Sequence, residues 1–135
     1  MKTVTSKIIS ILAANVMLAA MARADVVVIG NLAAPAMSKD EVTQFFLGKS
    51  QTMKPLDRPS SEPIKAQFYQ KLSGQDLSQV KATWSRLVFT GKASQPKELA
   101  DAAAVKKAVA ADPKAIGYID KSEVDSTVKV LLSLN

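Results

Sequence analysis

The chain has 135 residues, 18 of them basic and 12 acidic, and a formal net charge of +6 at neutral pH. It contains neither histidine nor cysteine, which excludes Ser-His and Cys-His nucleophiles, imidazole bases, disulfide bonds and zinc sites built from thiolate or imidazole. A single tryptophan and the lack of any run of basic residues also argue against a nucleic-acid-binding protein.

The first 24 residues are typical of a secretory signal peptide. Lys2 and Lys7 form a short basic segment before an apolar stretch over residues 8–21. Ala22-Arg23-Ala24 follows as a small-x-small cleavage pattern. The alternatives are a membrane anchor or a buried helix, but the stretch is shorter than the about 20 residues that span a bilayer. We therefore expect cleavage between Ala24 and Asp25 and a periplasmic product with no stable membrane insertion.

Residues 25–135 are expected to form one α/β domain. Without the three cations of the signal peptide, 15 basic residues face 12 acidic ones, so the mature net charge is +3. The domain opens with Val26–Gly30, a β-branched run ending in glycine that is typical of a strand buried on both faces of a sheet.

The first helix of the domain is predicted from a capping box. The hydroxyl of Ser38 and the carboxylate of Glu41 have the spacing that satisfies free amides at a helix start. We expect this helix to run to Phe46 or Leu47 and to end at Gly48. Gly48-Lys49-Ser50 has the letters of a phosphate loop, but that motif needs a glycine at position 43, where the chain has threonine, so we interpret it as a helix end.

A second helix is expected after a polar loop. Residues 49–61 contain two prolines and predict a loop with at most a short strand around Lys54–Asp57. The helix should begin near Ser61 with Pro63 in its first turn, and it should end at Ser73-Gly74. One face of this helix is apolar through Ile64, Phe68 and Leu72.

The third helix is predicted from Ser78 to a break at Gly91, and its inner stripe is expected to consist of Val80, Trp84, Leu87 and Val88. Its end, Phe89-Thr90-Gly91-Lys92, resembles the end of the first helix, Phe46-Leu47-Gly48-Lys49. Since the flanking residues differ, we interpret both as the same way of ending a helix, a glycine followed by a cation near the negative dipole end.

The last elements are a helix and two strands. An alanine-rich helix is expected over 101–111, followed by a strand over Ala115–Ile119. At the C-terminus, Val128, Val130, Leu132 and Leu134 alternate with Lys129 and Ser133, apart from Leu131, which predicts a half-buried strand at a sheet edge. Asp120, Glu123 and Asp125 lie close together, but their spacing does not match a calcium loop and predicts solvated surface, so we expect no metal and no cofactor.

The segment before the second helix carries the candidate binding residues. Arg58, Ser60 and Ser61 combine a guanidinium and two hydroxyls with the free amides and the positive dipole end of a helix, which are the parts of an oxyanion site. The alternative is that Ser61 is an N-cap and that Arg58 pairs with a surface carboxylate.

Together these segments resemble the phosphate-binding proteins of bacterial phosphate ABC transporters. The resemblance rests on residues 38–49, on the Arg-plus-serine segment that opens a helix containing Phe68, and on Ala115–Ile119. Residues 84–92 and Asp120-Lys121-Ser122 resemble more closely the short, single-domain relatives of that family. The resemblance implies a single lobe of a type II periplasmic-binding-protein fold, a mixed sheet flanked by helices.

The resemblance also implies a ligand site. Arg58 matches the arginine with which the family binds phosphate, and Ser60 stands where the family has an aspartate. Ser61 replaces a glycine, and Glu62, Pro63 and Ile64 replace a Ser-Gly-Thr turn. The ligand-binding residues implied for this chain are Arg58, Ser60, Ser61 and Glu62. Among them Glu62 departs from the family pattern in a way that opposes phosphate binding, because a carboxylate beside a phosphate is repelled by it.

Three hypotheses follow. The first is a non-enzymatic periplasmic module that binds phosphate or another oxyanion, with an ABC permease as partner or a second copy that completes the cleft. The second is a structural or protein-interaction module of the envelope with a vestigial ligand site. The third is a hydrolase that acts through Asp57 or Glu62, which the composition makes the least favoured, so we expect no enzyme.

Overall fold

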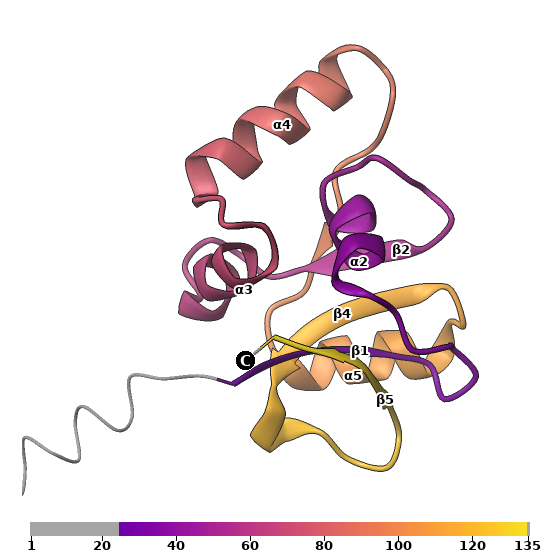
Figure 1. Cartoon of the computed structure of the whole chain (residues 1–135). Coiled ribbons are helices and arrows are strands. Elements are labelled where there is room, and N and C mark those ends of the chain that lie inside the picture. Colours follow the sequence, from indigo (N-terminus) through magenta and orange to yellow (C-terminus); the bar gives the residue numbers. More distant parts are fainter. Residues whose placement is uncertain (1–24, 135) are drawn as a thin grey trace, which may run out of the picture.

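The computed structural model describes residues 25–134, so the predicted signal peptide and its cleavage lie outside the described residues. The chain order and the arrangement of the elements can be followed in Figure 1. The elements are β1 (Val26–Gly30), α2 (Lys39–Phe46), β2 (Lys54–Asp57), α3 (Pro63–Ser73), α4 (Leu77–Phe89), β3 (Lys97–Glu98), α5 (Ala102–Ala111), β4 (Ala115–Asp120), the 3₁₀ helix η1 (Lys121–Glu123) and β5 (Lys129–Ser133).

The strands form one five-stranded mixed sheet in the order β3-β2-β4-β1-β5. β2 pairs in parallel with both β3 and β4, whereas β1 pairs antiparallel with both β4 and β5. The carboxyl ends of the parallel strands β2 and β3 therefore meet at one side of the sheet. Ligands of open α/β sheets commonly bind outside such ends.

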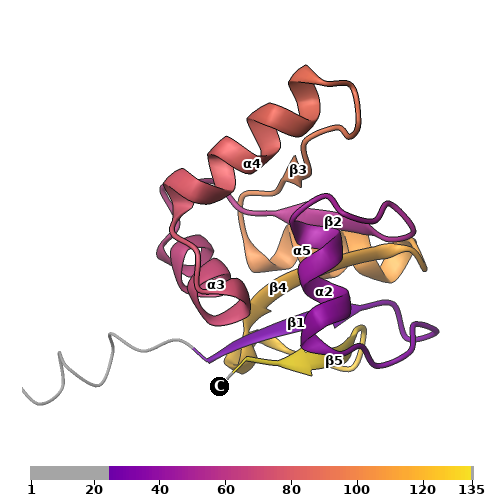
Figure 2. The ribbon, with the colours of Figure 1, turned by 45° about the horizontal axis from the view of Figure 1, so that its top comes forward.

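Helices cover both faces of the sheet, as Figure 2 shows. Along β1, Val26 and Val28 join the core under α2, α3 and α4, whereas Val27 and Ile29 join the core under α5. All five residues of β1 are buried, because both of its faces are covered. The predicted fold class and the predicted central strand are confirmed. None of the helices within residues 25–134 has the length and apolar character needed to cross a bilayer.

The predicted capping box and both predicted helix ends are confirmed. Ser38 and Glu41 cap α2 reciprocally. At the ends of α2 and α4, Gly48 and Gly91 adopt φ angles of 74° and 71°, a left-handed conformation that favours glycine. The lysine after each glycine donates its amide hydrogen five residues back, to Gln44 O at 2.8 Å and to Leu87 O at 2.9 Å, so both helices end in the same motif.

The C-terminal strand differs from its predicted pattern. β5 is at the sheet edge as expected, but its pairing with β1 shifts between Val28, opposite Leu132, and Ile29, opposite Val130. This bulge inserts Leu131, which is buried, while Val130 is 37% exposed. The predicted inner face is therefore wrong at Val130, and Leu131, the exception to the alternation, is buried instead, because one extra residue in a bulge moves the following side chains to the other face.

The inner stripe of α4 is narrower than predicted. Val80 and Trp84 are buried and Leu87 is partly buried, but Val88 is 45% exposed. α4 packs against α3 and against the end of α2 along a seam, and Val88 lies beyond it. The helix also begins earlier than expected, because Asp76 and not a later serine makes the capping box, with Gln79. The short strand β3 was not predicted, since its two exposed residues give no apolar signal.

The two helix-ending glycines provide a matched test of close packing. At Gly91 a Cβ atom would meet nothing within 4 Å, whereas at Gly48 it would lie 2.4 Å from Leu87 Cδ1. We expect Gly91→Ala to lower the free energy of unfolding by about 1 kcal/mol, from backbone strain alone. Gly48→Ala should cost about 1–3 kcal/mol more because it also overpacks the α2–α4 contact. Urea denaturation of both variants measures the difference, and equal losses would contradict the packing described here.

Candidate functional site

The junction between β2 and α3 buries two charged side chains. Asp57 and Arg58 are 4% and 6% exposed and are the buried charged residues of the described chain. Asp57 Oδ2 accepts a hydrogen bond from Tyr69 Oη at 2.7 Å. Its Oδ1 accepts one from the backbone N–H of Arg58 at 2.8 Å and another from the hydroxyl of Tyr118. The carboxylate therefore links β2 to α3 and to β4.

A cation completes the surroundings of this carboxylate. Lys65 Nζ lies 3.7 Å from Asp57 Oδ2 and 3.1 Å from Glu98 Oε2, and the side chain of Lys65 is only 11% exposed. Burying an unpaired carboxylate would cost several kcal/mol, and the lysine and the hydroxyl donors offset that cost. Lys65 and Tyr69 are four residues apart in α3, so one face of the helix contacts Asp57.

The two tyrosines are held as neutral hydrogen-bond donors. Burial raises the pKa of Tyr118, and the negative charge of Asp57 raises it further. The pKa of Tyr69 is raised well above its usual value by the same two causes, burial first. The ring of Tyr118 stacks on that of Phe68, with centroids 3.9 Å apart and planes 6° apart, which fixes the direction of its hydroxyl.

Arg58 is the predicted anion-binding residue with the clearest unsatisfied group. Its Nε atom is buried and has no hydrogen-bond partner. Its Nη2 atom lies 4.0 Å from Glu62 Oε1, a carboxylate on a side chain that is 40% exposed. A guanidinium presents its donors in a fixed fork, and within the described residues the buried Nε–H of this fork remains unsatisfied.

The start of α3 differs in one residue from the sequence prediction. The N-cap is Glu62, not Ser61, and no side chain bonds to the free amides of this helix start. Ser60 and Ser61 are exposed in the turn before it. The alternative prediction that Ser61 caps the helix is therefore wrong, whereas the pairing of Arg58 with a nearby carboxylate is present, through Glu62.

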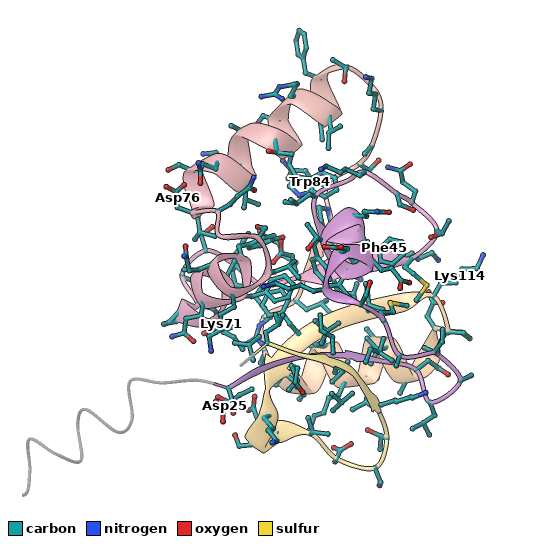
Figure 3. All side chains as sticks on the ribbon, viewed as in Figure 1. Asp25, Phe45, Lys71, Asp76, Trp84 and Lys114 are labelled. Atoms are coloured by element: carbon teal, nitrogen blue, oxygen red, sulfur yellow. The ribbon has the colours of Figure 1, made fainter. Side chains whose placement is uncertain are left out.

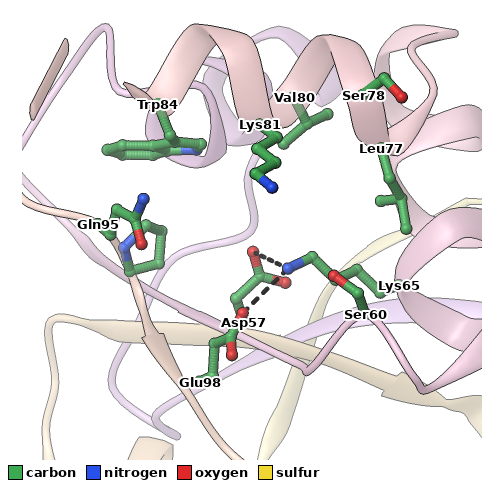
Figure 4. A pocket seen from close by; sticks show the side chains of 11 residues that line it. Asp57, Ser60, Lys65, Leu77, Ser78, Val80, Lys81, Trp84, Gln95 and Glu98 are labelled. Carbon is green, nitrogen blue, oxygen red and sulfur yellow. Dashed lines mark hydrogen bonds and ion pairs between the residues drawn. The ribbon is translucent and has the colours of Figure 1, made fainter. Parts of the chain in front are cut away.

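A cavity of about 350 Å³ opens beside this junction, between α4 and the ends of β2 and β3 (Figure 4). Ser60 lines it, but Arg58, Ser61 and Glu62 do not, so the fold brings only one of the four predicted ligand residues to the cavity. The residues that line the cavity are Asp57, Ser60, Lys65, Leu77, Ser78, Val80, Lys81, Trp84, Gln95, Pro96 and Glu98.

The cavity has one cation that the described chain does not neutralise. Lys81 reaches into the cavity from α4, as Figure 4 shows, and its ammonium has no ion pair within residues 25–134. Lys65, by contrast, forms ion pairs with Asp57 and Glu98. Sequence reasoning missed Lys65 and Lys81, because residues far apart in the chain form the cavity. The four-residue spacing of Lys65 and Tyr69 was the one available signal.

The acidic residues near the C-terminus act locally. Asp120 Oδ1 accepts a hydrogen bond from Ser122 N at 2.9 Å and caps η1. Asp125 binds Lys106 at 3.0 Å, and its pKa is lowered to about 2, chiefly by the Thr127 hydroxyl. Within residues 25–134, no group of three or more potential metal ligands comes together.

The chain was compared with known proteins. No protein-family model and no curated protein matches it. Several solved structures do, among them the following two. One is an ABC-type phosphate transport receptor from Vibrio cholerae, 12% identical, with a TM-score of 0.59 over 80% of this chain and 45% of the receptor. The other is a phosphate ABC transporter substrate-binding protein from Clostridium perfringens solved with bound phosphate, 13% identical, with a TM-score of 0.62 over 80% of this chain and 44% of that protein.

These matches confirm the predicted resemblance at the level of the fold. The chain shares the mixed α/β architecture of substrate-binding proteins of phosphate transporters. It spans less than half of the length of either protein, which agrees with the prediction of a single lobe. At 12–13% identity the likeness concerns the fold alone, and the ligand of this chain has to be argued from its own residues.

The raised tyrosine pKa values predict a pH dependence of stability. In the folded protein Tyr69 and Tyr118 stay protonated at pH values where tyrosines of the unfolded chain ionise, above about pH 10. The unfolded state then binds fewer protons, so stability is fully present below about pH 10 and falls as the pH rises, by about 1.4 kcal/mol per pH unit for each tyrosine.

The double variant Tyr69→Phe, Tyr118→Phe should lose this alkaline decline. It should be less stable than the parent near neutral pH, because Asp57 loses two donors. Its free energy of unfolding should nevertheless fall less steeply above about pH 10. Urea denaturation from neutral to alkaline pH measures both slopes, and lysine titration is common to the two proteins. Parallel slopes would contradict the assignment.

Proposed function

We propose that this chain is a periplasmic, non-enzymatic module that binds phosphate or a related oxyanion at the β2–α3 junction. One observation carries the proposal: the buried Nε donor of Arg58 has no partner, and Arg58 lies four residues before Glu62, the N-cap of a helix start without a side-chain cap. A helix N-terminus presents free amides and a positive dipole end, which favour a bound anion.

The surroundings of the junction supply further donors. The hydroxyls of Ser60 and Ser61 are exposed in the same turn, and Lys81 offers an ammonium from the far side of the adjoining cavity. The fold supports the proposal because both similar structures are phosphate transport proteins, one of them with phosphate bound. By the same argument, an ABC permease is the proposed partner.

Glu62 and the size of the chain set the expected affinity. The Glu62 carboxylate lies 4.0 Å from Arg58 Nη2, where it competes with an anion for the guanidinium. A single lobe also leaves a bound anion exposed to water and salt, which weaken charged contacts. We therefore propose weak, salt-sensitive binding by the monomer, and a second copy that completes the cleft as the route to tighter binding.

A second candidate function is a structural or protein-interaction role in the envelope. The Arg58–Glu62 contact favours it, since a guanidinium already paired within the chain needs no ligand. An enzymatic role is not favoured for Asp57, because its carboxylate is buried and accepts hydrogen bonds from three donors. A general base needs a free lone pair directed at its substrate.

Isothermal titration calorimetry with phosphate and with sulfate tests the proposal. Arg58→Ala should weaken binding about 10- to 100-fold through the loss of charge-assisted hydrogen bonds, and Arg58→Lys should have an intermediate effect. Glu62→Gln should strengthen binding roughly five- to tenfold, because it removes the competing carboxylate while keeping the shape of the side chain.

Lys107→Ala is the matched control, since this exposed lysine of α5 lies outside the junction and the cavity. Thermal unfolding should show that each variant remains folded. The absence of binding heat for both anions, with the parent chain and with Glu62→Gln, would refute the anion-binding proposal and favour the protein-interaction role.

A further inference from the structure

The fold brings together the two helix ends that share the Phe-x-Gly-Lys pattern. A Cβ atom at Gly48 would lie 2.4 Å from Leu87 Cδ1, so the end of α2 packs directly on α4. Trp84 Nε1 donates a hydrogen bond to Phe46 O at 3.0 Å, which satisfies a free carbonyl at the end of α2. Figure 3 shows Trp84 between the two helices.

The two phenylalanines of this pattern have opposite environments. Phe46 is fully buried, whereas Phe89 is 92% exposed and its neighbour Val88 is 45% exposed. Helix termination explains the Gly-Lys pair at each end, because the cation compensates the negative dipole end. It does not explain a phenylalanine side chain in water at the last residue of α4.

Cations without partners lie at the ends of α2 and α4. Lys49, Arg86 and Lys92 are exposed, and their side chains form no hydrogen bond or ion pair within residues 25–134. Arg86 lies one helical turn before Phe89, and Lys92 lies three residues after Phe89. Residues 42–56 and 77–97 contain no aspartate or glutamate. We call the surface formed by Lys49, Arg86, Val88, Phe89 and Lys92 the helix-end surface.

The shape of the helix-end surface decides between two kinds of partner. A stable protein interface buries about 800 Å² on each partner around an apolar centre. The side chains of Phe89 and Val88 supply only a small part of that area. The C-terminal end of α4 is an outermost part of the fold in Figure 1, so it projects outward. A lipid surface needs no complementary pocket and accepts a projecting aromatic ring among its headgroups.

We propose that the helix-end surface binds anionic lipid bilayers reversibly, with Phe89 inserted at the headgroup level and with Lys49, Arg86 and Lys92 facing lipid phosphates. One apolar insertion and a small basic patch together give the two weak signals that peripheral binding requires. The proposal does not rest on the oxyanion site, because none of these residues belongs to the β2–α3 junction or to the cavity.

Co-sedimentation of residues 25–135, the predicted mature chain, with vesicles tests the proposal. We expect binding to equimolar phosphatidylglycerol–phosphatidylcholine vesicles at low salt, and little binding to pure phosphatidylcholine vesicles. The triple variant Lys49→Gln, Arg86→Gln, Lys92→Gln should lower the partition coefficient at least about 30-fold. Phe89→Ala should lower it roughly tenfold.

Matched controls separate this surface from general charge and apolarity. The triple variant Lys39→Gln, Lys107→Gln, Lys121→Gln removes three other exposed lysines and should change the partition coefficient less than about threefold. Leu32→Ala removes a different exposed apolar side chain, 62% exposed, and should have little effect. Thermal unfolding of each variant shows whether the fold is intact.

A site-specific probe shows whether position 89 inserts. The natural Trp84 is 6% exposed, so Phe89→Trp adds an exposed fluorophore whose emission should shift to the blue and be quenched by brominated acyl chains. No binding to anionic vesicles, an unquenched Trp at position 89, or equal losses in the two triple variants would overturn the proposal. Failure of phosphate binding in the calorimetric experiment would leave it unaffected.

Discussion

A carboxylate buried at the carboxyl end of β2 joins three elements of this fold. Asp57 accepts hydrogen bonds from Tyr69 of α3 and Tyr118 of β4, and Lys65 of α3 balances its charge. Because a buried carboxylate is tolerated only when its oxygens are fully satisfied, these donors have to stay in place whenever the domain is folded. The contact thereby fixes where α3 begins relative to the sheet. The position of every candidate ligand residue, from Arg58 onward, follows from it.

The same constraint separates structural charge from available charge. Asp57 and Lys65 neutralise each other in the wall of the cavity, so neither is free to recruit a ligand. The groups left unpaired at this site within the described residues are the buried Arg58 Nε, before the start of α3, and the Lys81 ammonium on the other side of the cavity. Electrostatic attraction for an anion therefore comes from few groups in a partly open site, where water screens each of them. This is why weak binding, and a second lobe that excludes water, are the natural expectations for a chain that spans less than half of its structural neighbours.

Two chemically similar helix ends have different roles in the structure. Phe46 forms edge-to-face contacts with Phe68 and Tyr118 and belongs to the core, whereas Phe89 is in solvent. The difference arises because α2 lies on the sheet, whereas α4 packs against α3 and against the end of α2 and leaves its last residue outside these contacts. A helix attached along one narrow seam leaves its opposite face exposed, and residues 77–97 contain no aspartate or glutamate to pair with the cations at its end.

The sequence by itself determined the local features: the strand at Val26–Gly30, the capping box at Ser38 and the glycine ends of α2, α3 and α4. These depend on the intrinsic preferences of a few adjacent residues, which any window of the chain contains. It also placed Arg58 and Ser60 at a helix start. Only the tertiary structure decided the bulge that buries Leu131, the partners of Asp57, the Arg58–Glu62 contact and the entry of Lys81 into the cavity. Each of these joins residues from different elements or depends on how neighbouring strands align. Burial and pairing are set by the packed neighbours, and local sequence does not encode which neighbours those will be.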